Sequence, residues 1–165
     1  MRCGGWVEVP ILVAVRLKGH VGLHPDVKKT LQLLNLKRTN YAVIIPDTPA
    51  VRGMLRKVAP YITWGTPNKQ TLITLLKRME IRGDGRLGDE ALKGIGVKTV
   101  EELAEQIINT PSKLKELREK LGLRPYVRLH PPRKGFKHSI KRPYKDKGEW
   151  GDRGDAINEL IRRMA

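Results

Sequence analysis

Apolar residues in the first 65 positions alternate between a spacing typical of strands and one typical of helices. β-branched and aromatic runs over residues 7–16, 41–46 and 61–65 predict three strands. Between these runs, apolar residues recur at i, i+4 and i+7 in the stretches that open at Pro25 and Pro49. Because proline is favoured in the first helical turn, these stretches predict two amphipathic helices. The predicted order is β-α-β-α-β.

The middle of the chain has helical spacing. Thr66 and Pro67 repeat the cap-then-proline signal before a third predicted helix, and the three glycines of residues 82–88 predict a flexible connection after it. Thr99 and Thr110 open two further helices, the second running to about residue 121; Thr99 has an acidic partner, Glu102, for a capping box. We therefore expect a helical extension over residues 66–123.

Residues 124–147 are rich in charge and poor in apolar side chains, with nine basic residues, one acid and four prolines. They predict an extended basic arm that orders only against a folded polyanion, because it has little apolar surface to bury. A short terminal helix follows and places four apolar residues on one face, from which we expect it to dock on the body: Ile157, Leu160, Ile161 and Met164.

The charge is large and uneven. The chain carries 33 Lys and Arg against 17 Asp and Glu, a formal charge of +16. Residues 1–65 hold 10 basic and 3 acidic residues, residues 66–124 hold 12 and 9, and residues 125–165 hold 11 and 5. We expect three parts: a core at 1–65, a helical extension at 66–123, and the arm with its terminal helix at 124–165.

Composition excludes several classes of protein. A hydrophobic fraction of 39% excludes wholesale disorder, and the single cysteine, Cys3, excludes an intramolecular disulfide and a thiolate metal cage. The apolar run over residues 9–15 contains Pro10 and is too short to span a membrane. A basic excess of this size requires a polyanion, and without a long basic amphipathic helix it favours nucleic acid over a membrane surface.

Motifs for catalysis or cofactor binding are weak. A Gly-x-Gly-x-x-Gly pattern at residues 83–88 follows a predicted helix instead of a strand, and Asp84 would repel a phosphate. His20 and His24 are four residues apart in a stretch that glycine and proline keep from being helical, with no acidic third ligand close by. We expect no cofactor, no metal, no small-molecule substrate and no catalytic residue.

One motif supports an alternative function. Residues 94–100 resemble the hairpin turn of helix-hairpin-helix modules, whose backbone amides hold a phosphate, and would make residues 82–124 a DNA-binding module. The same glycines also fit a simple helix end and helix start. The acidic run that follows weakens nucleic-acid binding there.

Basic side chains on the predicted helices, loops and arm are the candidate RNA-binding residues. Four aromatic residues near them, Trp6, Trp64, Phe136 and Tyr144, are candidate stacking partners, although core packing is the commoner role, especially for Trp64. Phosphate contacts of this kind predict steeply salt-dependent binding. The candidates are Lys18, His20, Lys28, Lys29, Lys37, Arg38, Arg52, Arg56, Lys57, Arg133, Lys134, Lys137, His138, Lys141 and Arg142.

Two stretches carry a family resemblance. Leu-Lys-Arg-Thr-Asn at 36–40 and Asp-Thr-Pro-Ala-Val-Arg-Gly-Met at 47–54 strongly resemble the central signature of the large-subunit ribosomal protein L-thirty family, called L-seven in eukaryotes. Residues 10–65 cover the shared core, and residues 154–164 are similar to the C-terminus of the longer archaeal and eukaryotic members. The long lysine-rich N-terminal extension of eukaryotic members is missing, which favours an archaeal source.

The resemblance implies an α+β fold, somewhat ferredoxin-like, with a three-stranded antiparallel sheet and a helical C-terminal extension. It implies no catalysis. The implied role is to bind ribosomal RNA in the cytoplasmic large subunit, near the central protuberance and the 5S RNA, beside other ribosomal proteins. Within the matched motif it assigns RNA contact to Lys37, Arg38, Arg52 and Arg56.

Overall fold

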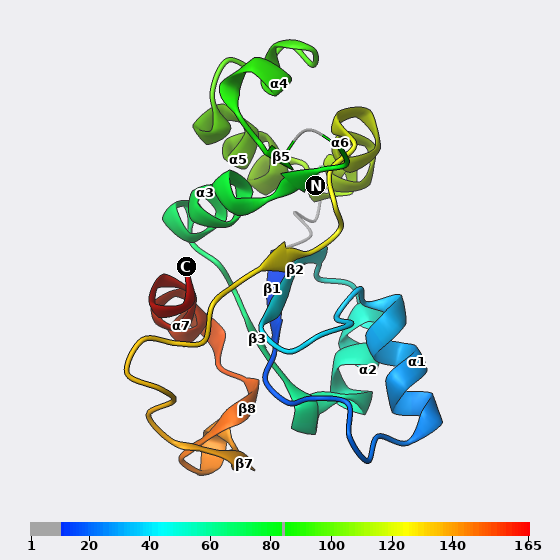
Figure 1. Cartoon of the computed structure of the whole chain (residues 1–165), viewed down its shortest axis with the longest axis vertical. Helices are drawn as coiled ribbons and strands as arrows, with labels where there is room; N and C mark the ends of the chain where they lie inside the picture. The colour runs from blue at the N-terminus through cyan, green and yellow to red at the C-terminus, as the bar shows by residue number, and fades with distance from the viewer. Residues whose placement is uncertain (1–10, 84) are drawn as a thin grey trace, which may run out of the picture.

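The computed structural model describes residues 11–83 and 85–165, and its N-terminal part has the expected β-α-β-α-β order (Figure 1). Residues 7–10 of the first predicted strand lie outside the described residues, as do Cys3 and Trp6. The elements are β1 (Ile11–Arg16), α1 (Pro25–Leu33), β2 (Tyr41–Pro46), α2 (Pro49–Lys57) and β3 (Ile62–Gly65), with a 3₁₀ turn (Ala59–Tyr61) before β3.

Both helices of this unit begin where the sequence predicts. Proline occupies the first position of each helix, and its missing N–H costs nothing there because the first turn has no backbone partner. The Thr48 side chain accepts a hydrogen bond from the Val51 N–H at 3.2 Å and caps α2. His24 Nδ1 accepts from the Asp26 N–H at 3.4 Å at the start of α1.

The middle of the chain is helical, as expected, but residues 82–88 are not a flexible connection. Glu80 pairs with Arg86 and Ile81 with Gly85 in a short antiparallel ladder. Leu87 is buried, which ties this hairpin to the core and explains why the glycines did not leave it free. The elements are α3 (Lys69–Arg78), β4 (Glu80–Ile81), β5 (Gly85–Arg86), α4 (Asp89–Lys93), α5 (Val100–Asn109) and α6 (Leu114–Leu121).

The arm is not a separate extended segment in the structure, because its strands join the sheet of the core. β6 (Val127–Arg128) pairs antiparallel with β2, and β8 (Gly148–Asp152) pairs parallel with β3. β7 (Ser139–Pro143) lies beyond β8. Val127 and Leu129 are buried, so these two side chains anchor a segment whose average composition is polar.

The sheet has six strands in the described chain instead of the three expected, in the order β6-β2-β1-β3-β8-β7. Its centre is the expected antiparallel arrangement, with β1 paired to β2 on one side and to β3 on the other. The arm adds strands at both edges. The fold is α+β, and in the part of the chain that the structure describes no helix is long and apolar enough to cross a bilayer.

The sheet separates two hydrophobic cores, because successive side chains of a strand point to opposite faces. Leu12 and Ala14 of β1 face α1 and α2, whereas Val13 and Val15 face α3, α5 and α7. Figure 1 shows α1 and α2 on one side of the central strands and α3 and α7 on the other. All six residues of β1 are buried, as its continuous apolar run predicts.

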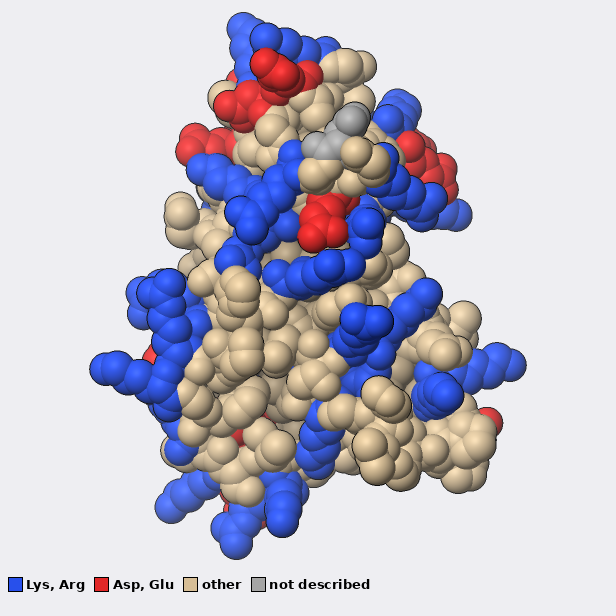
Figure 2. Space-filling model, viewed as in Figure 1, with Lys and Arg blue, Asp and Glu red and all other residues tan. Residues whose placement is uncertain are grey.

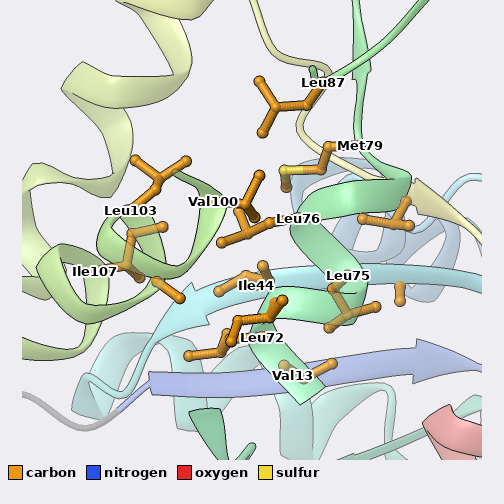
Figure 3. Close-up of a cluster of buried hydrophobic side chains, with 14 of the residues drawn as sticks. Val13, Ile44, Leu72, Leu75, Leu76, Met79, Leu87, Val100, Leu103 and Ile107 are labelled. Carbon is orange, nitrogen blue, oxygen red and sulfur yellow. The ribbon is translucent and has the colours of Figure 1, made fainter. Parts of the chain in front are cut away.

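The larger core joins the sheet to the helical extension. Figure 3 shows Val13 and Ile44 of the sheet facing Leu72 and Leu76 of α3, with Ile107 of α5 beside them. The terminal helix α7 (Ile157–Met164) packs on the same core, and its four predicted apolar residues are at most 2% exposed. Its docking on the body is therefore confirmed.

A glycine makes the docking of the terminal helix possible. A Cβ at Gly65, the last residue of β3, would lie 2.0 Å from the Gly154 carbonyl oxygen and 2.8 Å from Ile157 Cβ. These distances are shorter than any real carbon contact, so only glycine lets the start of α7 approach the strand.

Candidate nucleic-acid interface

Helices α1 and α2 each carry exposed cations, which together we call the helix face: Lys28 and Lys29 of α1, and Arg56 and Lys57 of α2. All four side chains are exposed. Their positions follow from the helical period, because Leu31 of α1 and Leu55 of α2 point into the smaller core and leave the cations on the outer side. The structure thus places these four predicted residues on the outer sides of the two helices.

Arg52 differs from its neighbours on α2. Its Nε donates a hydrogen bond of 2.5 Å to Asp47 Oδ1, and its Nη2 donates one of 2.5 Å to Asp47 Oδ2. The side chain of Asp47 is only 6% exposed, so the pair fixes the start of the helix. Hydrogen bonding and charge attraction from Asp47 raise the pKa of Arg52, whose charge is already partly balanced.

The core loops bring a second group of cations to the surface. Lys37 and Arg38 are exposed between α1 and β2, and His20 is exposed in the loop after β1. Lys18 Nζ lies 5.7 Å from the centroid of the Tyr61 ring. Burial and the nearby positive charge of Lys141 lower the pKa of Lys18, so the loop and the arm meet although they are distant in sequence.

The arm presents its six predicted residues in pairs, and all are exposed: Arg133, Lys134, Lys137, His138, Lys141 and Arg142. Lys137 forms an ion pair with Glu159 of α7, and this hydrogen bond lowers the pKa of Glu159. The His138 backbone N–H donates to Glu149 Oε1 at 2.9 Å. These contacts hold the arm against the body.

A buried ion pair connects the arm to the sheet. Arg153 Nη2 lies 2.6 Å from Glu149 Oε2, and both side chains are at most 6% exposed. Arg153 Nε also donates to Thr63 Oγ1 of β3 at 2.8 Å. Because β8 carries Glu149, the pair ties β8 to β3 and the basic strand β7 to the sheet.

Charge is distributed unevenly over the surface. Figure 2 shows Lys and Arg from the top to the lower edge of the visible face, whereas Asp and Glu gather mainly over the helical extension at the top. The candidate residues therefore lie on the core and the arm, and the extension carries a mixed surface.

The predicted aromatic partners are mainly packing residues. Trp64 is half-buried against the smaller core and Phe136 against the larger one. Tyr144 is 37% exposed, and its ring centroid lies 5.0 Å from the guanidinium of Arg153. Trp6 lies outside the described residues.

Sequence reasoning missed an aromatic pair with cations around it. Tyr41 of β2 and Tyr126, just before β6, stack with ring centroids 4.5 Å apart and planes 10° apart. Arg124 and Arg128 flank Tyr126. Tyr41 belongs to the predicted core and Tyr126 to the predicted arm, so only the pairing of β2 with β6 reveals the cluster.

The two rival motifs do not form their sites. The glycines of residues 83–88 are spread over the β4–β5 hairpin and the N-cap of α4, so they do not form the single turn from a buried strand to a helix that dinucleotide binding requires. In the helix-hairpin-helix candidate, the Lys98 N–H donates to Glu102 Oε2 at 3.0 Å. A carboxylate thus occupies an amide that a phosphate would need. Within residues 11–83 and 85–165, no three potential metal ligands cluster.

A β-α-β-α-β core with basic helices defines a small α+β protein whose surface suits a polyanion. The family described as Ribosomal protein L30p/L7e matches residues 12–62, from β1 to the start of β3. The chain belongs to this family.

Relatives in three archaea are each named large ribosomal subunit protein uL30. The Ignicoccus hospitalis protein is 48% identical over 93% of this chain and 97% of its own length. The Hyperthermus butylicus protein is 44% identical over 97% and 93%, and the Korarchaeum cryptofilum protein is 41% identical over 95% and 96%. The similarity therefore extends well beyond the family core, into the extension and the arm.

Proposed function

We propose that this protein is a structural constituent of the large ribosomal subunit, in the cytoplasm, and that it binds ribosomal RNA. The observation that carries the proposal is the 48% identity to a large-subunit protein over nearly the full length of both chains. The exposed cations of the core and arm agree with it. Members of this family are structural components, and the protein is not an enzyme.

The RNA contacts in this proposal are phosphate contacts made by exposed cations. Neutralising phosphates releases their counterions, so each contact adds to affinity and to its salt dependence. Arg52 contributes mainly by positioning α2 through Asp47. The other contact residues are Lys18, His20, Lys28, Lys29, Lys37, Arg38, Arg56, Lys57, Arg133, Lys134, Lys137, His138, Lys141 and Arg142.

The three parts of the chain have different roles in the proposal. Residues 1–65 form the RNA-binding core, residues 66–123 the helical extension, and residues 124–165 the arm with its terminal helix. The extension carries both charge signs, so we assign it to a neighbouring ribosomal protein or to the edge of the RNA interface. The 5S RNA near the central protuberance is the proposed second RNA partner.

Sedimentation tests the function directly. An antibody against the native protein is used to follow it through sucrose gradients of a cell lysate, at low and high salt. We expect it to travel with the large subunit and to dissociate as salt rises, because phosphate contacts carry the binding. Migration only at the top of the gradient in both salts would overturn the proposal.

A second experiment tests the proposal with purified components. Filter binding compares large-subunit ribosomal RNA with duplex DNA of similar length. Preferential, salt-sensitive binding of the ribosomal RNA supports the proposal, and equal or stronger binding of DNA contradicts it.

A further inference from the structure

The stacked tyrosines lie at the open edge of the sheet, beside β6. Tyr41 is directly opposite Arg128 in the β2–β6 pairing, so Tyr126, two residues earlier, lies on the same face of the sheet. The two rings are nearly parallel and both side chains are half-buried, which leaves part of the pair in contact with solvent. Two aromatic rings so arranged form a rigid, partly apolar platform.

Cations surround the hydroxyl group of this platform. Arg124 Nη1 donates a hydrogen bond to Tyr126 Oη at 3.0 Å. This hydrogen bond, with a smaller contribution from Arg128, lowers the pKa of Tyr126. Arg78 lies against Arg128, with its Nη1 3.5 Å from the Arg128 carbonyl oxygen. Three guanidinium groups therefore gather at one edge of the sheet.

Only part of this charge is balanced. Glu80 Oε2 lies 3.4 Å from Arg124 Nε and is the one carboxylate paired with these arginines in the described chain. The cluster keeps an excess of two positive charges in a small area. Figure 2 shows Lys and Arg side chains crossing the middle of the molecule at the height where Figure 1 draws β6.

A groove of about 410 Å³ opens between the end of α1 and α6, and the chain neighbours of Arg124 contribute to its lining. Its walls include Asn35, Arg82, Lys115 and Glu119, and Leu123 and Pro125 also line it. Arg118 holds the α6 wall in place, because its Nη2 donates to the Ile44 carbonyl oxygen of β2 at 2.6 Å. Burial lowers the pKa of Arg118 to about 10, which marks it as a packed side chain. The groove thus has fixed walls and a mostly basic rim.

We propose that this platform, formed by Tyr41, Tyr126, Arg124 and Arg128, holds an unpaired nucleotide of the bound RNA. The inference rests on the proposed function and gives it a single-stranded contact. The phosphate lies at the two arginines, whose planar forks match its oxygens, and the base lies against the tyrosine pair. Bases within a duplex are already stacked on their neighbours, so only an unpaired base has a free face for the rings.

Two short RNA probes of the same length test the preference for single strands. Fluorescence anisotropy measures binding of the full chain to a labelled 12-nucleotide oligouridylate and to a 12-base-pair RNA duplex. Removing the half-buried ring with Tyr126→Leu is expected to weaken oligouridylate binding about tenfold, the effect of losing one stacked base. Duplex binding is expected to change less than twofold. An equal change for both probes would overturn the stacking role.

Two further variants separate the contribution of the Tyr126 ring from that of the positive charge on Arg124. Tyr126→Phe keeps the ring and is expected to keep the single-strand preference, which also controls for folding. Arg124→Gln is expected to weaken both probes and to reduce the salt slope by about 0.7 to 0.9, the value of one phosphate contact. The matched control Lys93→Gln removes an exposed charge from α4, far from the platform in sequence, and is expected to leave the slope unchanged. A loss at Lys93 equal to that at Arg124 would contradict the site.

Crosslinking identifies the contact in the unaltered protein. Large-subunit ribosomal RNA containing 4-thiouridine is bound to the wild-type chain, irradiated and digested, and crosslinked peptides are mapped by mass spectrometry. Crosslinks at Tyr41 or within residues 124–128 support the inference. Binding with crosslinks only elsewhere overturns the inference and leaves the proposed function standing, whereas failure of the wild-type chain to bind ribosomal RNA overturns both.

Discussion

The two faces of the central sheet bury similar side chains but present different surfaces. The face under α1 and α2 has the smaller core, and the outer sides of these helices carry the four cations of the helix face. The face under α3, α5 and α7 has the larger core, and the outer side of α5 carries Glu101, Glu102 and Glu105. Hydrophobic packing determines both faces, whereas the charges on the outer sides of α1 and α2 differ from those on the outer side of α5.

This comparison also shows that the arm and the extension contribute to stability in different ways. The extension adds only apolar area to the larger core, whereas residues 124–165 add buried side chains to that core and also strands at both edges of the sheet. Side chains of β1 pack in both cores, so a destabilising substitution in either core affects the packing of the same strand. The following predictions test how far the two faces can be separated.

The largest effect is expected from the buried ion pair of the arm. Glu149→Gln leaves Arg153 charged and buried without its counterion, which should lower the free energy of unfolding by about 3–5 kcal/mol. Urea denaturation followed by circular dichroism measures it. The exposed pair Lys69–Glu105 gives the control, since Glu105→Gln should cost less than about 1 kcal/mol. Equal small losses would mean that the arm is not fastened through Arg153.

Matched leucine truncations on the two faces come next. Leu76→Ala in the larger core and Leu55→Ala in the smaller core each remove a side chain that is at most 1% exposed. Each should lower the free energy of unfolding by about 2–5 kcal/mol. Because the faces share β1, we expect one cooperative transition in each variant, measured by both tryptophan fluorescence and circular dichroism. Two separate transitions would show that the faces unfold independently.

Reversing charge on one face should change RNA binding without changing the fold. Arg56→Glu with Lys57→Glu removes two exposed cations of the helix face, and the slope of log affinity against log salt should fall by about 1.4–1.8. The control Lys93→Glu with Lys98→Glu makes the same charge change on the extension and should leave the slope nearly unchanged. We avoid Arg52 here because its substitution would also unpair Asp47. Equal slopes in both double variants would place RNA on both faces.

The smallest effect is a pH dependence at the arm. Lys137 lowers the pKa of Glu159, so the folded state favours the ionised carboxylate. This stabilisation is present above the unfolded pKa of glutamate and is lost as pH falls through the lower folded pKa. Thermal melts between about pH 5 and pH 3 measure the melting temperature as pH falls. The melting temperature of Lys137→Met should fall slightly less over this range than that of the wild type. An identical decline in both proteins would mean that the pair contributes nothing.

Local sequence signals predicted the N-terminal unit and the terminal helix well. The proline at the start of α1 and the Thr48 cap of α2 are signals that depend only on neighbouring residues. The four apolar residues of α7 likewise share one face because of the helical period alone. Elements whose formation depends on neighbouring residues are the ones that a single sequence predicts.

Contacts between distant segments escaped prediction. β6 is only two residues long, and its place beside β2 depends on Val127 being buried by α3 and its neighbours. The stacking of Tyr41 on Tyr126 follows from that pairing. The sequence predicted Arg52 to be an exposed cation. The spacing of Arg52 and Asp47 did not indicate that the two side chains would form a hydrogen-bonded pair. Long-range pairing and local charge balance therefore required the structure.

The parallel pairing of β3 with β8 has a consequence for how the chain is made. β3 leaves the exit tunnel early, whereas its partner follows more than 80 residues later. At roughly 5–20 residues per second, the nascent polypeptide waits several seconds with this sheet edge uncovered. Free strand edges invite pairing between chains, so shielding by a chaperone is most valuable during that interval.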